Sequence, residues 1–256
     1  MKQSLKSFAK QKLNKLNIAI TRYQYLESLE GYDNDINQMA QLPTVKLEKL
    51  LAVFNQSKSQ SRQDLFVLTE LDFKKNGYFV EFGATNGIDF SNSYLLEKDF
   101  GWNGILAEPA KCWHKALKEN RTSNIETNCV WTDSNLTLNF NEVESAELST
   151  ISAYNSSDIH SSCRKNGNTY EVSTISLLDL LDKYNAPKEI DYLSIDTEGS
   201  EYEILRDFDF NKYTFNVITC EHNYTPMREK IFHLLTSWGY RRKYLGFSKW
   251  DDWYVR

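Results

Sequence analysis

From residue 78 onward the chain alternates short apolar runs with stretches that carry apolar residues at helix-like spacing. This alternation is typical of a parallel β-sheet whose strands are joined by crossover helices. A chain of 256 residues with 41% hydrophobic content is long enough and apolar enough to bury the core of such a sheet. We therefore predict an α/β protein with a mostly parallel sheet.

The apolar runs predict five strands, at residues 78–82, 104–107, 125–131, 190–195 and 215–220. Helix-like spacing predicts helices at residues 93–99, 112–120, 177–184, 200–205 and 226–238. Thr225 is expected to cap the last of these helices, with Pro226 at its first position. Beyond that helix, aromatic residues on both sides of a turn at 247–249 predict an antiparallel hairpin at one edge of the sheet.

Two other segments differ in composition from this repeating pattern. Residues 1–70 are rich in Lys, Gln, Asn and Ser and predict a helical extension in front of a main domain at 71–256. Lysines cluster at its start, which indicates either the solvated face of a packing helix or a basic amphipathic helix resting on a membrane surface. Residues 132–175 are dense in Ser, Asn and Thr and predict a polar insertion over one end of the sheet.

Charge and cysteine content narrow the classes of function. The net charge is −5, so the chain has no general attraction for nucleic acid, which we exclude as a partner. The four cysteines form no C-x-x-C pair, so neither a zinc site nor a disulfide framework is indicated and a reducing cytoplasm is expected. No run of 18 apolar residues and no signal peptide is present, which predicts a protein that is neither exported nor membrane-spanning.

A glycine loop and an acidic residue after two consecutive strands point to a nucleotide-like ligand. The loop from Gly83 to Gly87 follows the first strand, and glycine lets the backbone approach a ligand closely. Glu108 ends the next strand, where a carboxylate can hold both hydroxyls of an adenosine ribose. Taken alone, the glycine loop is explained equally well as a tight turn.

The identity of the nucleotide follows from what the loop lacks. A dinucleotide site needs G-x-G-x-x-G around a pyrophosphate, and the sequence GATNG does not supply it. Glu81 also directs a carboxylate toward the loop, which would repel a pyrophosphate but suits the sulfonium and ammonium groups of S-adenosylmethionine. A dehydrogenase is therefore disfavoured. The predicted cofactor-binding residues are Glu81, Gly83, Ala84, Thr85, Asn86, Gly87, Ser91, Asn92, Glu108, Pro109, Asp133 and Asp196.

Three blocks of sequence resemble the FkbM family of S-adenosylmethionine-dependent methyltransferases. They read GYFVEFGATNGIDFSNSYLLEKDFGWNGILAEP, IDYLSIDTEGSEYEIL, and CEHN followed by a helix and GY. The resemblance covers roughly two thirds of the chain, from about residue 77 to the end. It implies a Rossmann-like class I methyltransferase fold with a seven-stranded sheet, and methyl transfer to a hydroxyl of a sugar or natural product. The family resemblance does not extend to residues 1–70, and Thr85 stands where the general methyltransferase loop has glycine.

Acidic residues after the fourth and fifth strands are the candidates for the reaction itself. Asp196 and Glu198 follow one strand, and Glu221 follows the next, so they should meet at one edge of the sheet. Because an alcohol must lose its proton to accept a methyl group, we assign Asp196, Glu198 and His222 to catalysis, with His222 as general base. Asp196, Glu221 and Asn223 form a possible magnesium site. Alternatively, Glu198 simply favours the N-terminus of the following helix.

The predicted function is O-methylation of a sugar, a glycan or a related hydroxylated metabolite. The hydroxyl and amide groups of residues 132–175 suit a polar acceptor. A second hypothesis is a catalytically silent domain that binds S-adenosylmethionine, or a partner through the N-terminal helices. The oligomeric state, the acceptor and the role of residues 1–70 are not determined by the sequence.

Overall fold

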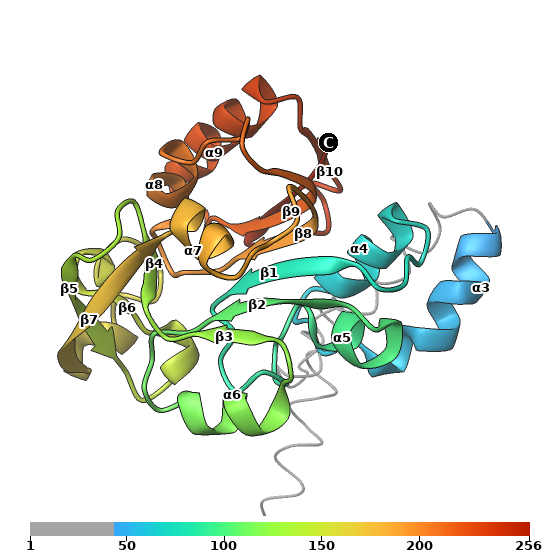
Figure 1. The fold of residues 1–256 in the computed structure, drawn as a ribbon. Coiled ribbons are helices and arrows are strands. Elements are labelled where there is room, and N and C mark those ends of the chain that lie inside the picture. Colours follow the sequence, from blue (N-terminus) through green and yellow to red (C-terminus); the bar gives the residue numbers. More distant parts are fainter. Residues whose placement is uncertain (1–43) are drawn as a thin grey trace, which may run out of the picture. The chain divides into compact units, whose positions relative to one another are not determined.

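The computed structural model describes residues 44–256, and a seven-stranded sheet runs through its centre (Figure 1). In spatial order the strands are β10 (Arg241–Lys243), β11 (Asp251–Val255), β9 (Thr214–Glu221), β8 (Glu189–Ile195), β1 (Tyr78–Phe82), β2 (Asn103–Ala107) and β3 (Asn124–Glu126). Strands β3, β2, β1, β8 and β9 are parallel, and β11 runs antiparallel to both β9 and β10. The predicted mostly parallel sheet with a C-terminal edge hairpin is confirmed.

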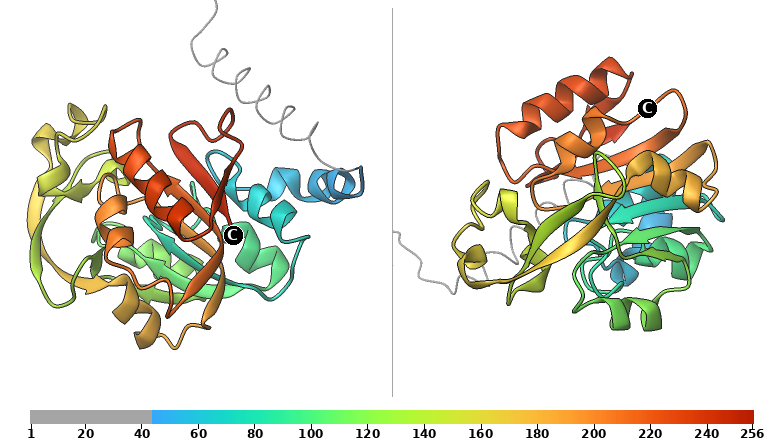
Figure 2. Two further views of the ribbon diagram at one scale, coloured as in Figure 1. Left: turned by 90° about the horizontal axis from the view of Figure 1, so that it is seen from above. Right: turned by 60° about the vertical axis from the view of Figure 1, so that its left-hand side comes forward.

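Helices cover both faces of this sheet, as Figures 1 and 2 show. One face packs on α7 (Leu177–Lys183), α8 (Glu201–Arg206) and α9 (Met227–Ser237) through side chains such as Val80 and Tyr254. On the other face, Phe66 of α4 (Gln63–Glu70) stacks on Trp253 at 4.8 Å. Because successive strand residues point to opposite faces, two covered faces require nearly continuous apolar strands. The remaining helices are α3 (Thr44–Val53), α5 (Tyr94–Phe100) and α6 (His114–Asn120).

Two local predictions need correction. The last long helix begins at Met227, one residue later than predicted, with Pro226 rather than Thr225 as its N-cap. The predicted strand at 125–131 is two strands, because β3 ends at Glu126 and its carboxylate accepts the Asn128 N–H at 2.9 Å, which turns the chain. Only β3 belongs to the central sheet.

The second piece of that predicted strand starts a smaller sheet. In spatial order its strands are β4 (Cys129–Trp131), β7 (Asn168–Ser176), β5 (Thr137–Glu142) and β6 (Thr150–Ile151). Buried Phe140, Ile151 and Val172 form its core. Three short 3-10 turns lie between β5 and β7, namely η2 (Ala146–Leu148), η3 (Ser152–Tyr154) and η4 (Cys163–Asn166), whereas η1 (Phe54–Gln56) follows α3. The polar insertion thus has a core of its own.

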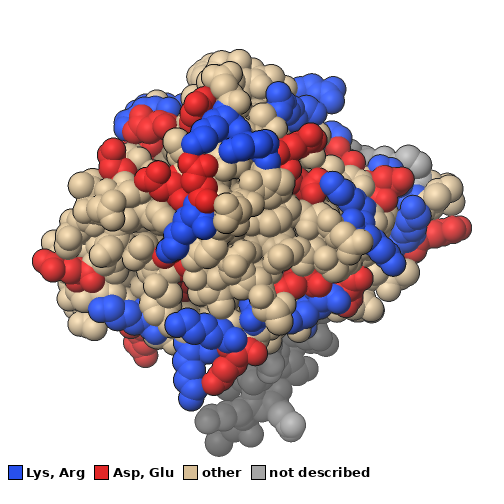
Figure 3. All heavy atoms as spheres, viewed as in Figure 1, with Lys and Arg blue, Asp and Glu red and all other residues tan. Residues whose placement is uncertain are grey.

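The predicted basic helix at the start of the chain lies outside the described residues. Within residues 44–256, no helix is both long and apolar enough to cross a membrane. Acidic and basic side chains are interspersed over the face of the molecule drawn in Figure 3. That face therefore presents no single-sign patch of the kind that binds a polyanion.

Candidate active site

The order of the strands makes the carboxyl end of β1 the candidate ligand site. The chain leaves β1 toward β2 and β3 on one side, and it later returns to β8 and β9 on the other. In open parallel sheets, ligands bind where the strand order reverses in this way. The loops that follow β1, β8 and β9 meet at this edge and contain most of the predicted site residues.

The glycine loop lies directly against the end of β8. Gly83 has a φ of 74°, and a Cβ atom added there would collide with the backbone carbonyl of Asp196. Gly87 has a φ of 81°, and a Cβ there would lie 2.6 Å from the Arg121 side chain. These are the left-handed conformations that glycine adopts without steric cost. Ala84 is fully buried, and Thr85 also takes a left-handed φ of 47°.

Glu108 fastens the glycine loop to the end of β2. Its two carboxylate oxygens accept hydrogen bonds from the N–H groups of Thr85 and Ala110, both at 2.8 Å. Burial raises the pKa of Glu108 to about 7, although these two hydrogen bonds favour the ionised form. Through the contact with Thr85, the carboxylate that follows β2 binds the backbone of the glycine loop directly. Each oxygen keeps a further acceptor position for a ligand.

Glu81 organises the segment that follows the glycine loop. Its buried carboxylate accepts hydrogen bonds from Ser91 Oγ at 3.1 Å, from the Asn92 N–H at 2.6 Å and from Ser93 Oγ. Arg121, whose side chain is wholly buried, lies 3.8 Å away and favours the ionised form, whereas burial raises the pKa of Glu81. Glu81 is thus held by the protein itself, and no pattern along the sequence pointed to Arg121 as its partner.

Asn92 and the neighbouring predicted residues have different surroundings. Asn92 Nδ2 donates to Ser194 Oγ at 3.0 Å, and its buried Oδ1 has no hydrogen-bond partner among the described residues. Asn86 and Pro109 are half-buried. Asp133 is exposed and follows β4 of the small sheet. It therefore does not lie at the end of a central strand, which was the reason to predict it as a cofactor-binding residue.

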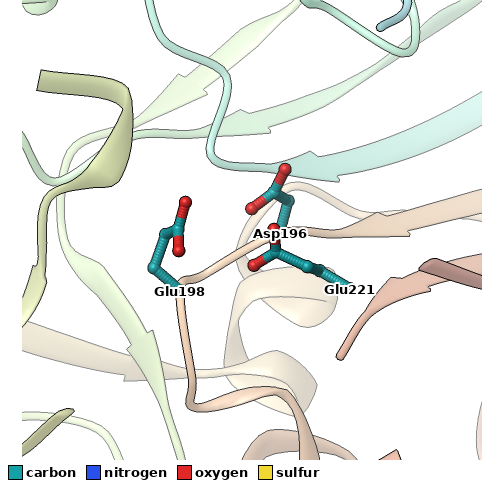
Figure 4. A group of neighbouring side chains, drawn as sticks. All are labelled: Asp196, Glu198 and Glu221. Atoms are coloured by element: carbon teal, nitrogen blue, oxygen red, sulfur yellow. The ribbon is translucent and has the colours of Figure 1, made fainter. Parts of the chain in front are cut away.

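Three carboxylates converge at the carboxyl ends of β8 and β9, as Figure 4 shows. Asp196, Glu198 and Glu221 each offer an oxygen, and these oxygens lie within 4.8 Å of one another. Burial, together with the charges of Asp251 and Glu201, raises the pKa of Asp196 to about 8. Burial and the neighbouring carboxylates also raise the pKa of Glu198 and Glu221. Crowded acids of this kind hold a proton or bind a cation.

Glu198 is the member of this cluster with fixed partners. Its Oε2 accepts hydrogen bonds from Arg164 Nη2 at 2.7 Å and from Asn223 Nδ2 at 3.1 Å. The amide of Asn223 therefore serves the carboxylate in this structure. Arg164 comes from the polar insertion, far from Glu198 in sequence, and no local pattern pointed to it.

His222 has its polar contacts outside the carboxylate cluster. Its Nδ1 accepts a hydrogen bond from the Tyr224 N–H at 2.9 Å, so the proton of the neutral ring is on Nε2. Nε2 lies 3.7 Å from Asp252, and the side chain is only 1% exposed. Burial lowers the pKa of His222 to about 4. Asp252 is in turn held by Arg228 and Arg242.

Comparison with known proteins identifies the family of this chain. Residues 81–242 match the model of the methyltransferase FkbM domain, which is more than half of the chain. A search of curated proteins found no match.

Among solved structures, the FkbM methyltransferase from Methylobacillus flagellatus KT is 11% identical with a TM-score of 0.48, and the match covers 90% of this chain and 60% of that one. A precorrin-6y C5,15-methyltransferase from Geobacter metallireducens GS-15 is 11% identical with a TM-score of 0.39, covering 70% and 71%. The METTL16 methyltransferase domain is 11% identical with a TM-score of 0.39, covering 74% and 63%. From the match over residues 81–242, the chain belongs to the FkbM family of S-adenosylmethionine-dependent methyltransferases.

Proposed function

We propose that this methyltransferase transfers the methyl group to a hydroxyl of a sugar, a glycan or a related hydroxylated metabolite. The observation that carries the proposal is the convergence of Asp196, Glu198 and Glu221 beside the glycine loop. An alcohol is a poor nucleophile until its proton leaves, so an O-methyltransferase needs a group that accepts this proton. A cluster of carboxylates with raised pKa values, next to the cofactor loop, supplies such a group.

The residues at the end of β1 fit S-adenosylmethionine. Gly83 and Gly87 allow the backbone to approach a ligand, and Glu108 keeps acceptor positions for ribose hydroxyls. The unpartnered Oδ1 of Asn92 would accept a hydrogen bond from a donor such as the ammonium group. When bound, S-adenosylmethionine supplies the electrophilic methyl group. The chain's part is to align the acceptor oxygen with it and to take up the proton.

We assign the uptake of the proton to Asp196. Its pKa is raised to about 8, and a general base works best when its pKa lies near the operating pH. Glu198 and Glu221, within 4.8 Å, keep that proton within the cluster. His222 is less suited to this role, because its Nε2 carries the proton and faces Asp252. In our proposal His222 instead fixes the turn after β9.

A divalent ion is a second way for the same carboxylates to act. Asp196, Glu198 and Glu221 would hold Mg²⁺, which prefers oxygen ligands, and the ion would supply positive charge beside the acceptor oxygen. Relative to the ligands predicted from the sequence, Glu198 replaces Asn223, whose amide donates to it. Assays in EDTA and in magnesium distinguish this route from catalysis by Asp196 alone.

We also propose a reducing, cytoplasmic compartment, because the four cysteines form no C-x-x-C pair in the sequence. The face drawn in Figure 3 mixes acidic and basic side chains, which favours a small polar acceptor over nucleic acid. A catalytically silent domain would have no need for a crowded acidic cluster at its strand ends, because buried charges are costly.

Calorimetric titration with S-adenosylmethionine, S-adenosylhomocysteine and NAD tests the cofactor. We expect binding of the first two ligands only, loss of binding in Glu108→Ala, and no loss in the exposed control Glu171→Ala.

Methyl transfer from radiolabelled cofactor to a panel of methyl glycosides then tests the acceptor. Asp196→Asn should abolish transfer, whereas His222→Gln should retain it. Binding of NAD alone, or full activity of Asp196→Asn, would contradict the proposal.

A further inference from the structure

The turn that carries Glu198 is strained and is held from outside the central sheet. Glu198 has a φ of 59°, in the left-handed region that residues with a Cβ atom rarely adopt, whereas Gly199 after it has a φ of 126°, which glycine adopts without steric cost. Strained conformations such as that of Glu198 persist only where the surrounding structure fixes them, and they cluster at functional sites. The groups that fix this turn should therefore matter for where the Glu198 carboxylate lies.

The polar insertion contacts this turn at three points. Thr150 Oγ1 donates to the carbonyl of Glu198 at 2.9 Å. The ring of Tyr154 covers Gly199 so closely that a Cβ atom there would lie 3.0 Å from Cδ1 of the tyrosine. Arg164 Nη2 donates to the Glu198 carboxylate at 2.7 Å. Backbone, glycine and carboxylate of the turn are thus each in contact with the insertion.

Arg164 is itself rigidly held. Its guanidinium donates through Nη1 to both oxygens of Asp158, at 3.0 and 2.9 Å, and through Nε to the carbonyl of Leu148 at 2.8 Å. Its side chain is 0% exposed, and its own carbonyl accepts from Asn141 Nδ2 of β5 at 2.8 Å. A planar guanidinium engaged on several sides has little freedom to follow a moving partner.

From these contacts we infer that Arg164 is the positioning residue for Glu198. The inference rests on the proposed function, and it gives residues 146–166 a role in holding one carboxylate of the acidic cluster in place. Among the salt bridges of the described residues, Arg164 is the cation that pairs with Glu198. It occupies Oε2 together with Asn223, which leaves Oε1 for Asp196 and Glu221. Without it, a buried carboxylate crowded by two other acids would have to move or rearrange its contacts.

A double-mutant cycle tests the contact without any acceptor. Arg164→Gln should raise the unfolding equilibrium constant. In a Glu198→Gln background, the factor by which the same substitution raises this constant should be smaller by about tenfold or more. Amide hydrogen exchange should quicken at 197–201 and 146–166 together, with 78–82 unchanged. Additive effects of the two substitutions would overturn the inference, even if the protein proves to be an active methyltransferase.

Kinetics on the methyl glycoside selected by the acceptor panel test the positioning role. We expect Arg164→Gln to lower kcat about tenfold or more while the Kd for S-adenosylmethionine changes less than about twofold. Arg164→Lys keeps one charge for Glu198 and should restore part of kcat. Arg206→Gln, which removes a half-exposed ion pair with Asp207, is the control and should change neither quantity. An unchanged kcat in Arg164→Gln would overturn the inference, whereas failure of the wild type to bind S-adenosylmethionine would instead overturn the proposed function.

Discussion

Substitution of Gly83 by alanine tests the close approach of the glycine loop to the backbone of Asp196, at the end of β8. The Cβ atom of alanine would lie far closer than 3.0 Å to the carbonyl oxygen of Asp196, and that oxygen belongs to backbone that cannot rotate away. The left-handed φ of 74° costs about 1 kcal/mol for any residue with a Cβ. Overpacking adds about 1–3 kcal/mol. We therefore expect Gly83→Ala to lower the free energy of unfolding by about 2–4 kcal/mol.

The matched control is Gly239→Ala, at the end of α9. Gly239 has a similar φ of 87°, but a Cβ atom there has nothing within 4 Å. It should lose only the conformational part, about 1 kcal/mol. Urea unfolding with a shared m value gives both free energies. Equal losses in the two variants would show that the loop does not press on Asp196 as described, and would refute the steric argument.

Two further predictions concern buried charges. Arg121→Gln removes the buried cation that pairs with Glu97 at 2.9 Å, so the free energy of unfolding should fall by about 3–5 kcal/mol. The control Lys115→Gln, in an exposed ion pair, should leave the free energy of unfolding unchanged. Equal urea midpoints for the two variants would contradict this prediction. Burial raises the pKa of Asp64 from 3.8 to about 6, so stability from this group is present below pH 4 and is lost as the pH rises through 6, by about 3 kcal/mol. Asp64→Asn should remove this loss, and an unchanged pH slope of unfolding between pH 4 and 7 would count against it.

The strands of the central sheet were predictable because they are buried on both faces. Residues 78–82 are apolar except for Glu81, residues 190–195 are apolar except for Asp191 and Ser194, and the structure confirms strands there. Composition did not separate β3 from β4, since residues 125–131 also have a strand-like pattern. The break depends on the Glu126 carboxylate accepting the Asn128 N–H and on pairing of β4 with β7, which lies some 40 residues further along.

The acidic cluster was also predictable. Asp196 and Glu221 lie at the ends of adjacent strands, and parallel strands bring their carboxyl ends to the same edge. The direction of the His222 ring was not predictable, because residues that follow a strand leave its alternating pattern and take their direction from loop contacts. The hydrogen bond from Tyr224 sets the ring of His222, and Asp252 comes from a strand near the end of the chain.

By itself, the sequence determined the class of fold, the glycine loop with its two acids and the family, because these depend on local pattern and on spacing along the chain. The tertiary structure decided the partners of the buried charges. Arg121 pairs with Glu81 from 40 residues away, and Arg164 pairs with Glu198 from 34 residues away. Desolvation makes an unpaired buried charge costly, but it does not specify which distant cation will supply the pair. Only the packing of the insertion and helices against the sheet made that choice.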